Sequence, residues 1–199
     1  MLMARPLTFV SDESAQSERH SDDLLVVRCQ ARDEQAFREL VRRWEPRLYY
    51  YLRRVIEDES AVWDVLQNTW LAVFRHLSRL EDPRRFRSWV YRIAHNQAAN
   101  WWHKEGRYVY QPNEHIEPMV NCEDSVSAAA DDVALLHQGL LKLSPLHREV
   151  LTLFYLEDLS LPQIAEIVGL PEGTVKSRLH HARKNLAEAL TEAGYERPR

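Results

Sequence analysis

The 199-residue sequence has only five glycines and almost no alternation of apolar with polar residues. Without that alternation, half-buried β-strands are not expected. No apolar run approaches the length that a membrane-spanning helix requires, so we expect no membrane insertion. Apolar residues still make up 45% of the chain, which is enough for well-packed cores. These features predict an all-α protein.

Cysteine is also scarce. Cys29 and Cys122 lie far apart in the sequence, which favours unpaired thiols in a reduced, cytoplasmic protein over a disulfide framework. Residues 1–21 lack the apolar core of a signal peptide, and we expect them to form a disordered arm.

The sequence also lacks the spacings of common catalytic and metal sites. It contains no phosphate-binding glycine loop, no H-E-x-x-H segment and no paired-cysteine zinc pattern. His180 and His181 are adjacent on a predicted helix and should point apart, so DNA contact is favoured over metal binding. A nuclease would need clustered acids, yet Asp82 and Glu105 lie at opposite ends of the basic segment. We expect no enzyme activity, no catalytic residues, no metal or other cofactor, and no small-molecule substrate.

Net charge is −4, but the charges are unevenly distributed. Residues 111–133 contain acids and neither lysine nor arginine, whereas residues 82–107 contain six arginines or lysines and two acids. A chain with basic faces and acidic connections can bind DNA while remaining acidic overall.

Residues 160–186 have the pattern of a helix-turn-helix. Ser160 and Gln163 form an S-x-x-Q capping box, Gly169 is suited to end the first helix, and Pro171 suits the first turn of the second. Apolar residues occupy one face of that second helix. Its other positions carry donors for base edges and phosphates: Thr174, Lys176, Ser177, Arg178, His180, His181 and Lys184. The alternative is an ordinary helical hairpin with a solvated basic face.

A long amphipathic helix is predicted over residues 60–80. One face is apolar, and the other carries Asp64, Gln67, Asn68 and Leu71, with Trp63 at its flank. A surface with one acid, two amides and exposed apolar groups is typical of a protein contact. From the helical wheel alone, an ordinary solvated face fits as well.

A second strong helix is predicted over residues 86–104, after a loop at residues 80–85. Ser88, Tyr91, His95 and Trp102 should form an outward strip, flanked by Arg87 and Arg92. Aromatic rings between arginines are suited to single-stranded DNA, because rings stack on bases and cations follow phosphates. Burial by a neighbouring helix is the alternative, and we expect at least one of these aromatics to be buried.

The remaining segments define two small helical domains. Two helices are expected between residues 22 and 55, the second capped by Asp33, and two more over residues 133–143 and 146–156. Gly106, Pro112, Pro118 and the acidic bias between the domains indicate a flexible acidic linker. The predicted organisation is an arm at 1–21, a domain at 22–105, a linker at 106–132, a helix-turn-helix domain at 133–190 and a tail at 191–199.

Three motifs together resemble the extracytoplasmic-function group of bacterial RNA polymerase sigma factors. DVLQNTWLAVF at residues 64–74 resembles the polymerase-binding helix of that family, and FRSWVYRIAHNQAANWW at residues 86–102 resembles its promoter-melting helix. Residues 143–186 resemble the domain that reads the minus-thirty-five promoter element. The resemblance covers residues 22–190.

The resemblance implies a role for each matched position. Polymerase binding falls on Trp63, Asp64, Gln67, Asn68 and Leu71. The loop at residues 80–85 would hold a flipped base of the minus-ten element, and contacts to the melted strand fall on Arg84, Arg85, Arg87, Tyr91, Arg92, His95 and Asn96. Contacts to the minus-thirty-five element fall on Thr174, Lys176, Ser177, Arg178, His180, His181 and Lys184. The implied partners are core RNA polymerase, promoter DNA and an anti-sigma factor.

Some positions depart from the family pattern. Asn68 stands where an acid is usual, which lowers charge complementarity to a basic polymerase surface. Trp89-Val90 stands where primary sigma factors have two tryptophans, which implies weaker melting and low tolerance of promoter mismatches. The competing hypothesis is a conventional helix-turn-helix regulator with an N-terminal helical dimerisation or ligand domain. It would explain residues 160–186 but not the two helices of the N-terminal half.

Overall fold

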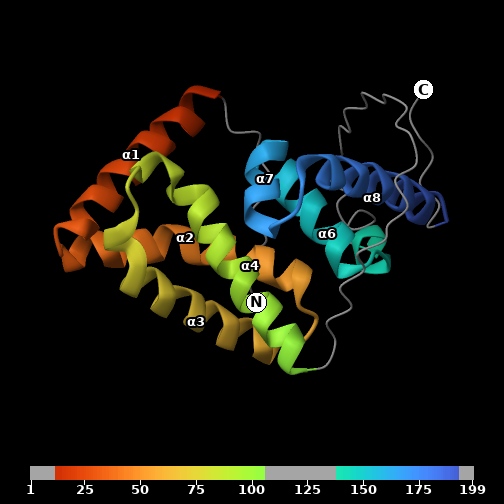
Figure 1. Ribbon diagram of the computed structural model, residues 1–199, viewed down its shortest axis with the longest axis horizontal. Helices are drawn as coiled ribbons and strands as arrows, with labels where there is room; N and C mark the ends of the chain where they lie inside the picture. Colours follow the sequence, from red (N-terminus) through yellow and green to blue (C-terminus); the bar gives the residue numbers. More distant parts are fainter. Residues whose placement is uncertain (1–11, 106–137, 193–199) are drawn as a thin grey trace.

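The computed structural model describes residues 12–105 and 138–192, and within these ranges all regular secondary structure is helical. The helices form two small domains, at residues 12–105 and 138–192, which lie side by side (Figure 1). None of the described helices is both long enough and apolar enough to cross a membrane. The expected linker, Cys122 and the last part of the tail lie outside the described residues.

The N-terminal domain consists of four α-helices and two short 3₁₀ turns. They are α1 (Asp12–Gln30), α2 (Glu34–Val55), α3 (Glu59–His76), η1 (Leu77–Arg79), η2 (Pro83–Arg85) and α4 (Phe86–Lys104). The bounds of α4 equal the predicted ones, and Asp33 caps α2 as predicted, because its Oδ1 atom accepts hydrogen bonds from the backbone of Gln35 and Ala36 at 2.9 and 3.0 Å.

Helix α2 forms the centre of this domain. Trp44 is buried, and its ring makes edge contacts with Phe86 and Tyr91 of α4, with ring centroids 5.3 and 6.1 Å apart. Pro46 lies within α2 and does not end it. The core therefore joins α2 to the helix that carries the predicted strand-binding residues.

Helix α1 begins earlier than expected. Residues 12–21 are helical, whereas the sequence had indicated a disordered arm over 1–21. The helix is held at its middle by Arg43, whose Nη1 atom donates to the Ser21 hydroxyl at 2.9 Å and to Asp22 Oδ1 at 2.8 Å. Long-range contacts of this kind leave no periodic pattern in a polar segment, so the helix could not be predicted from periodicity.

The C-terminal domain contains a helical segment at residues 138–142, followed by α6 (Pro145–Leu151), a π-helical turn η3 (Thr152–Leu156), α7 (Leu161–Val168) and α8 (Glu172–Glu192). Ser144 caps α6 through its hydroxyl, which accepts from the His147 backbone at 3.3 Å. Helices α7 and α8 form the predicted helix-turn-helix, joined at Gly169, which has a left-handed φ of 68°.

The two domains pack directly against each other. Helix α7 lies against α4, and α6 lies against α2 (Figure 1). The sequence had indicated two domains joined by a flexible linker and did not indicate this contact. This contact decides which of the predicted site residues face solvent.

Candidate polymerase and nucleic-acid interfaces

Helix α3 presents all five predicted polymerase-binding residues on one open face. Its opposite face packs into the core through Val62, Val65, Leu66, Thr69, Trp70 and Val73. On the open face Trp63 is 51% exposed and Leu71 47% exposed, and Asp64, Gln67 and Asn68 are exposed between them. The result is a continuous strip of apolar and polar groups along one side of the helix.

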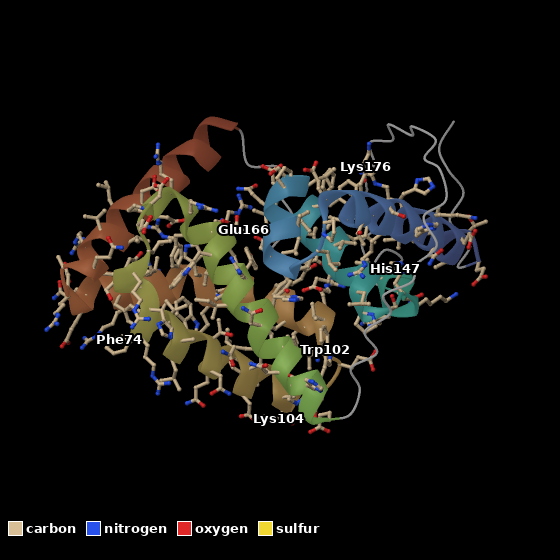
Figure 2. All side chains as sticks on the ribbon, in the orientation of Figure 1. Phe74, Trp102, Lys104, His147, Glu166 and Lys176 are labelled. Carbon is tan, nitrogen blue, oxygen red and sulfur yellow. The ribbon has the colours of Figure 1, made fainter. Side chains whose placement is uncertain are left out.

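Phe74 extends this open face by one further turn, and the site prediction did not include it (Figure 2). Its side chain is 69% exposed, and its ring meets Phe37 edge-on with centroids 5.3 Å apart. Leu71 and Phe74 are three residues apart, so they lie on the same side of the helix. The three-residue spacing could have placed Phe74 on this face from the sequence alone.

The loop before α4 holds Arg84 and Arg85 in different ways. Asp82 caps η2, and its Oδ1 atom accepts from the Arg84 side chain at 2.9 Å. Arg85 instead reaches the C-terminal domain, where its Nη2 atom lies 2.7 Å from both carboxylate oxygens of Glu166. Figure 2 shows Glu166 on the side of α7 that faces α4.

Helix α4 carries the remaining predicted strand-binding residues, and three of them contact acids of the C-terminal domain. The Arg92 guanidinium lies 3.7 Å from Glu166, and Arg87 donates to the backbone carbonyl of Glu157 and lies 3.7 Å from its carboxylate. His95 Nδ1 lies 2.7 Å from Glu149 Oε1. Asn96 is exposed.

The predicted outward strip of α4 is wrong for Ser88, Tyr91 and Trp102, which are buried. Tyr91 is fully enclosed, with its ring against Trp44 and Tyr51. Burial, and then the neighbouring carboxylate of Glu157, raise the pKa of Tyr91 well above its usual value. The expectation that at least one aromatic of this strip is buried is confirmed. A wheel drawn for one helix cannot show that both α2 and α7 pack against it.

Three acids of the C-terminal domain therefore meet the N-terminal domain, and sequence reasoning identified none of them. Glu149 lies on α6, Glu157 follows η3, and Glu166 lies on α7. We call this contact the interdomain seam and define it by Tyr51, Arg85, Arg87, Arg92 and His95 on one side and Glu149, Glu157 and Glu166 on the other. An additional ion pair joins buried Arg148 to Glu57 at 2.9 Å.

Glu149 is the buried centre of the seam. It is fully enclosed, and its Oε1 atom accepts from the Tyr51 hydroxyl as well as facing His95. Burial alone would raise the pKa of Glu149, but the charge and hydrogen bond of His95, the Tyr51 hydroxyl and the charge of Arg178 together lower it. Burial would lower the pKa of His95, and the charge and hydrogen bond of Glu149 outweigh that effect and raise it. Both shifts favour an imidazolium–carboxylate pair.

The predicted groove-reading residues of α8 are unequally accessible. Lys176 and Lys184 are exposed, and Thr174, His180 and His181 are partly exposed, with Lys176 at the outer edge of α8 (Figure 2). Ser177 and Arg178 are buried, so the outward orientation predicted for Ser177 is wrong. The reason is that α6 and α7 both pack against α8, which covers more of the helix than a single apolar stripe would.

The expectation that His180 and His181 point apart is wrong, because their rings meet edge to face with centroids 5.7 Å apart. Within residues 12–105 and 138–192, no three His, Cys, Asp or Glu side chains gather in a way that could hold a metal ion. Cys29 is partly buried, and burial followed by the charge of Asp33 raises the pKa of its thiol to about 11. That thiol is therefore poorly ionised at neutral pH.

Comparison with known proteins agrees with this architecture. The sequence matches the family "Sigma-70 region 2" over residues 40–108 and the family "Sigma-70, region 4" over residues 134–186. It is 32% identical to the ECF RNA polymerase sigma-E factor of Haemophilus influenzae over 188 residues, covering 87% of this chain and 97% of that protein. It is 34% identical to the ECF RNA polymerase sigma factor SigL of Mycobacterium tuberculosis over 154 residues, covering 75% of this chain and 86% of that protein.

A solved structure, CnrH in complex with the cytosolic domain of CnrY, is 27% identical and covers 86% of this chain and 97% of that one, with a TM-score of 0.61. The fold and the sequence matches define a sigma-70-type protein with regions 2 and 4. More narrowly, the chain belongs to the extracytoplasmic-function group of RNA polymerase sigma factors. It is a transcription-initiation factor and not an enzyme.

Proposed function

We propose that this sigma factor binds core RNA polymerase through the open face of α3 and directs initiation from promoters that its two domains read together. The single observation that supports this most strongly is the α3 face itself. Trp63, Asp64, Gln67, Asn68 and Leu71 are all exposed on one side of a helix whose other side is buried. Exposed aromatic and aliphatic groups set among amides and one acid are suited to a protein partner.

The minus-ten contacts are assigned to the loop at residues 80–85 and to α4. Arg84, Arg85, Arg87 and Arg92 supply cations for the phosphates of the melted strand, and Tyr91, His95 and Asn96 supply ring and amide groups for its bases. Several of these groups lie in the interdomain seam, so they can serve this role only when the two domains separate.

The minus-thirty-five contacts are assigned to α8. Lys176 and Lys184 are placed for phosphates or base edges, with Thr174, Ser177, His180 and His181 as further donors in the major groove and Arg178 on a phosphate. The domains at residues 22–105 and 133–190 then act as two readers joined by the segment at 106–132. Each reader raises the effective concentration of the other once polymerase holds both.

We further propose a cytoplasmic location, where RNA polymerase acts, and regulation by an anti-sigma factor. The similarity to CnrH, which was solved in complex with the cytosolic domain of CnrY, supports such a partner. Asn68 of the α3 face leaves Asp64 as its one acid, which keeps the charge attraction to a basic polymerase surface modest.

Reconstitution with bacterial core RNA polymerase tests the proposal. Size-exclusion chromatography should yield a holoenzyme, and run-off transcription from a library of promoter fragments should give products that depend on the factor. Failure to bind core polymerase overturns the proposal. A stable dimer that binds an operator tightly without polymerase would instead support a conventional helix-turn-helix regulator.

A further inference from the structure

The side-chain amide of Gln30 joins α1 to the loop that precedes α4. Its Nε2 atom donates to the Leu77 carbonyl at 3.1 Å and to the Leu80 carbonyl at 2.7 Å. We infer that Gln30 is a positioning residue for the minus-ten contact, which sets the shape of the loop at residues 80–85 without touching DNA. This inference rests on the proposed function, which assigns a minus-ten contact to that loop.

Both hydrogen bonds depend on the donor end of the amide. Leu77 and Leu80 each present a carbonyl oxygen, so only the NH₂ group of Gln30 can bond to them, and its two N–H bonds are enough for both. The contacts are partly buried, which limits competition from water. One side chain thus holds two backbone groups that lie 47 and 50 positions further along the chain.

The two acceptors lie where α3 ends and the loop begins. Leu77 caps α3 and is the first residue of η1, and its carbonyl also accepts from the Leu80 backbone at 3.2 Å. Leu80 is the first residue of the loop. One amide group therefore fixes the start of the loop relative to the helix that carries the proposed polymerase face.

The turn that carries Gln30 has a defined geometry. The Arg28 guanidinium donates to Asp33 Oδ2 at 2.6 and 2.9 Å, which closes the turn between α1 and α2. Arg32 within this turn has a left-handed φ of 64°. Gln30 is the last residue of α1, so its side chain starts from the end of a helix and not from a long loop. A residue that positions others needs such support.

Asp23 acts on the other end of the loop from the same side of α1. It lies seven residues before Gln30, which is about two helical turns. The hydrogen bond and the charge of Asp82, and then the charge of Asp23, raise the pKa of Arg84. Asp82 also accepts from the Arg84 backbone at 3.1 Å through its Oδ1 atom. Gln30 thus holds the start of the loop, and Asp82 holds its last turn.

A loop that selects an unpaired base needs its groups in place before the base arrives. Groups held within about 0.5 Å of the binding geometry discriminate between bases, whereas a loop that moves can adapt to several. Loss of the Gln30 amide would release Leu80 and leave the Asp82 cap intact. The loop would then remain attached but lose precision, so the expected defect is in base selection and not in polymerase binding.

The test compares four variants of the full-length chain. Gln30→Met and Gln30→Glu keep about the same side-chain length and remove both N–H donors, whereas Gln30→Lys restores donors on a slightly longer stem. Gln35→Met makes the first of these changes at an exposed glutamine of α2 and is the control. If circular dichroism shows that the methionine variant has lost helix, Gln30→Glu, which has the shape of glutamine, decides the question in both assays.

Hydrogen exchange of the free chain, read by mass spectrometry over residues 77–85, measures the order of the loop. Gln30→Met and Gln30→Glu should exchange about tenfold faster there than the parent, the factor that two hydrogen bonds of ordinary net strength represent. Gln30→Lys should recover most of the protection, and the control should match the parent. Unchanged exchange in both variants that lack the donors overturns the inference.

Base selection is measured with the holoenzyme. Run-off transcription from a barcoded library, made by randomising the minus-ten element of a fragment that the parent transcribes, gives the base preference at each position. The preference at one minus-ten position should fall by up to about tenfold in Gln30→Met and Gln30→Glu and return in Gln30→Lys. The minus-thirty-five preference and the affinity for core polymerase should keep their parent values. An equal loss at every promoter position would show a merely structural role and overturn the inference.

Binding to core polymerase separates this inference from the proposed function. A parent chain that binds core polymerase, combined with Gln30→Met and Gln30→Glu variants that keep every base preference, overturns the role of Gln30 alone. A parent chain that does not bind core polymerase overturns the proposed function, whatever the exchange of the loop shows.

Discussion

The Nδ1 atom of His95 lies 2.7 Å from the Oε1 atom of Glu149, across the boundary between the two domains. The pKa of His95 is raised and that of Glu149 is lowered by this pairing, against the opposing effect of burial on each. Both shifts favour the charged forms of the two residues when the domains are closed. The pair therefore makes the contact between the domains depend on pH.

Closure should weaken as pH rises. A raised His95 pKa contributes to closure fully below the ordinary value of 6.5, and that contribution is lost as pH rises through the higher value of the closed state. The lowered pKa of Glu149 contributes above its ordinary value of 4.5 and is lost as pH falls through the depressed value. Closure is therefore most favourable between about 4.5 and 6.5 and declines above that range.

Energy transfer between dyes on the two domains, recorded from pH 6 to pH 9, measures this decline. The groups that face the pair are Tyr51 on α2 and Arg178 on α8, and burial raises the pKa of Tyr51 well above its usual value. His95→Gln removes the titrating group and should flatten the profile. An unchanged profile in that variant would contradict the assignment to His95.

Asp64→Ala combined with Gln67→Ala should weaken binding to core polymerase by about tenfold or more, equivalent to roughly 1.4 kcal/mol, while leaving the fold intact. Both side chains are exposed on α3, so the loss of either leaves no cavity. Glu34→Ala with Gln35→Ala on α2 likewise removes one acid and one amide at another exposed site and serves as the control. Surface plasmon resonance with immobilised core polymerase gives the two affinities, and a double α3 variant that unfolds would show that this face is structural.

Gly169→Ala and Gly173→Ala should change stability in opposite directions. A Cβ atom at either position meets no atom within 4 Å, so only the backbone conformation differs. Gly169 has a φ of 68°, where alanine costs roughly 1 kcal/mol, and Gly173 lies in the first turn of α8, where alanine gains up to about 1 kcal/mol. Urea unfolding of each variant gives the two free energies, and Gly169→Asn should fall between parent and alanine.

Trp44→Ala should destabilise the chain by roughly 3–5 kcal/mol, because it leaves a cavity beside Phe86 and Tyr91. Leu71→Ala removes a side chain that is 47% exposed and should change stability by about 0.5 kcal/mol or less. Comparison of the two variants distinguishes the contribution of the N-terminal core to stability from that of the α3 surface. Thermal unfolding followed by circular dichroism measures both, and a large loss in Leu71→Ala would mean that the α3 surface is packed in solution.

Local patterns were enough to predict the helices and most of their ends. The spacing of Val62, Val65 and Trp70 gave the buried face of α3, and Asp33, Ser144 and Gly169 mark ends that short-range hydrogen bonds and backbone geometry determine. The exposed residues of α3 could be predicted because only one side of this helix packs into the core. Its assigned role remains a prediction, since no contact with polymerase is present to test it.

Contacts between the domains could not be predicted in this way. Glu149, Glu157 and Glu166 are ordinary acids in the sequence, and nothing in their spacing indicates that they meet Arg87, Arg92 or His95. The burial of Tyr91 could not be predicted either, because it depends on Trp44 and Tyr51 of α2 and not on the periodicity of α4. The periodicity of a helix shows which of its faces is apolar. It does not show which polar residues are buried when a second helix packs on another face.

The open face of α3 implies an order of events. Trp63, Leu71 and Phe74 remain accessible while the cations of α4 are engaged across the seam. A partner that docks on α3 can therefore bind before the domains separate, whereas under the proposed function the melted strand would bind α4 only after they separate. Association with polymerase would be a second-order step without a lag, and capture of DNA a later first-order step whose rate does not increase with DNA concentration.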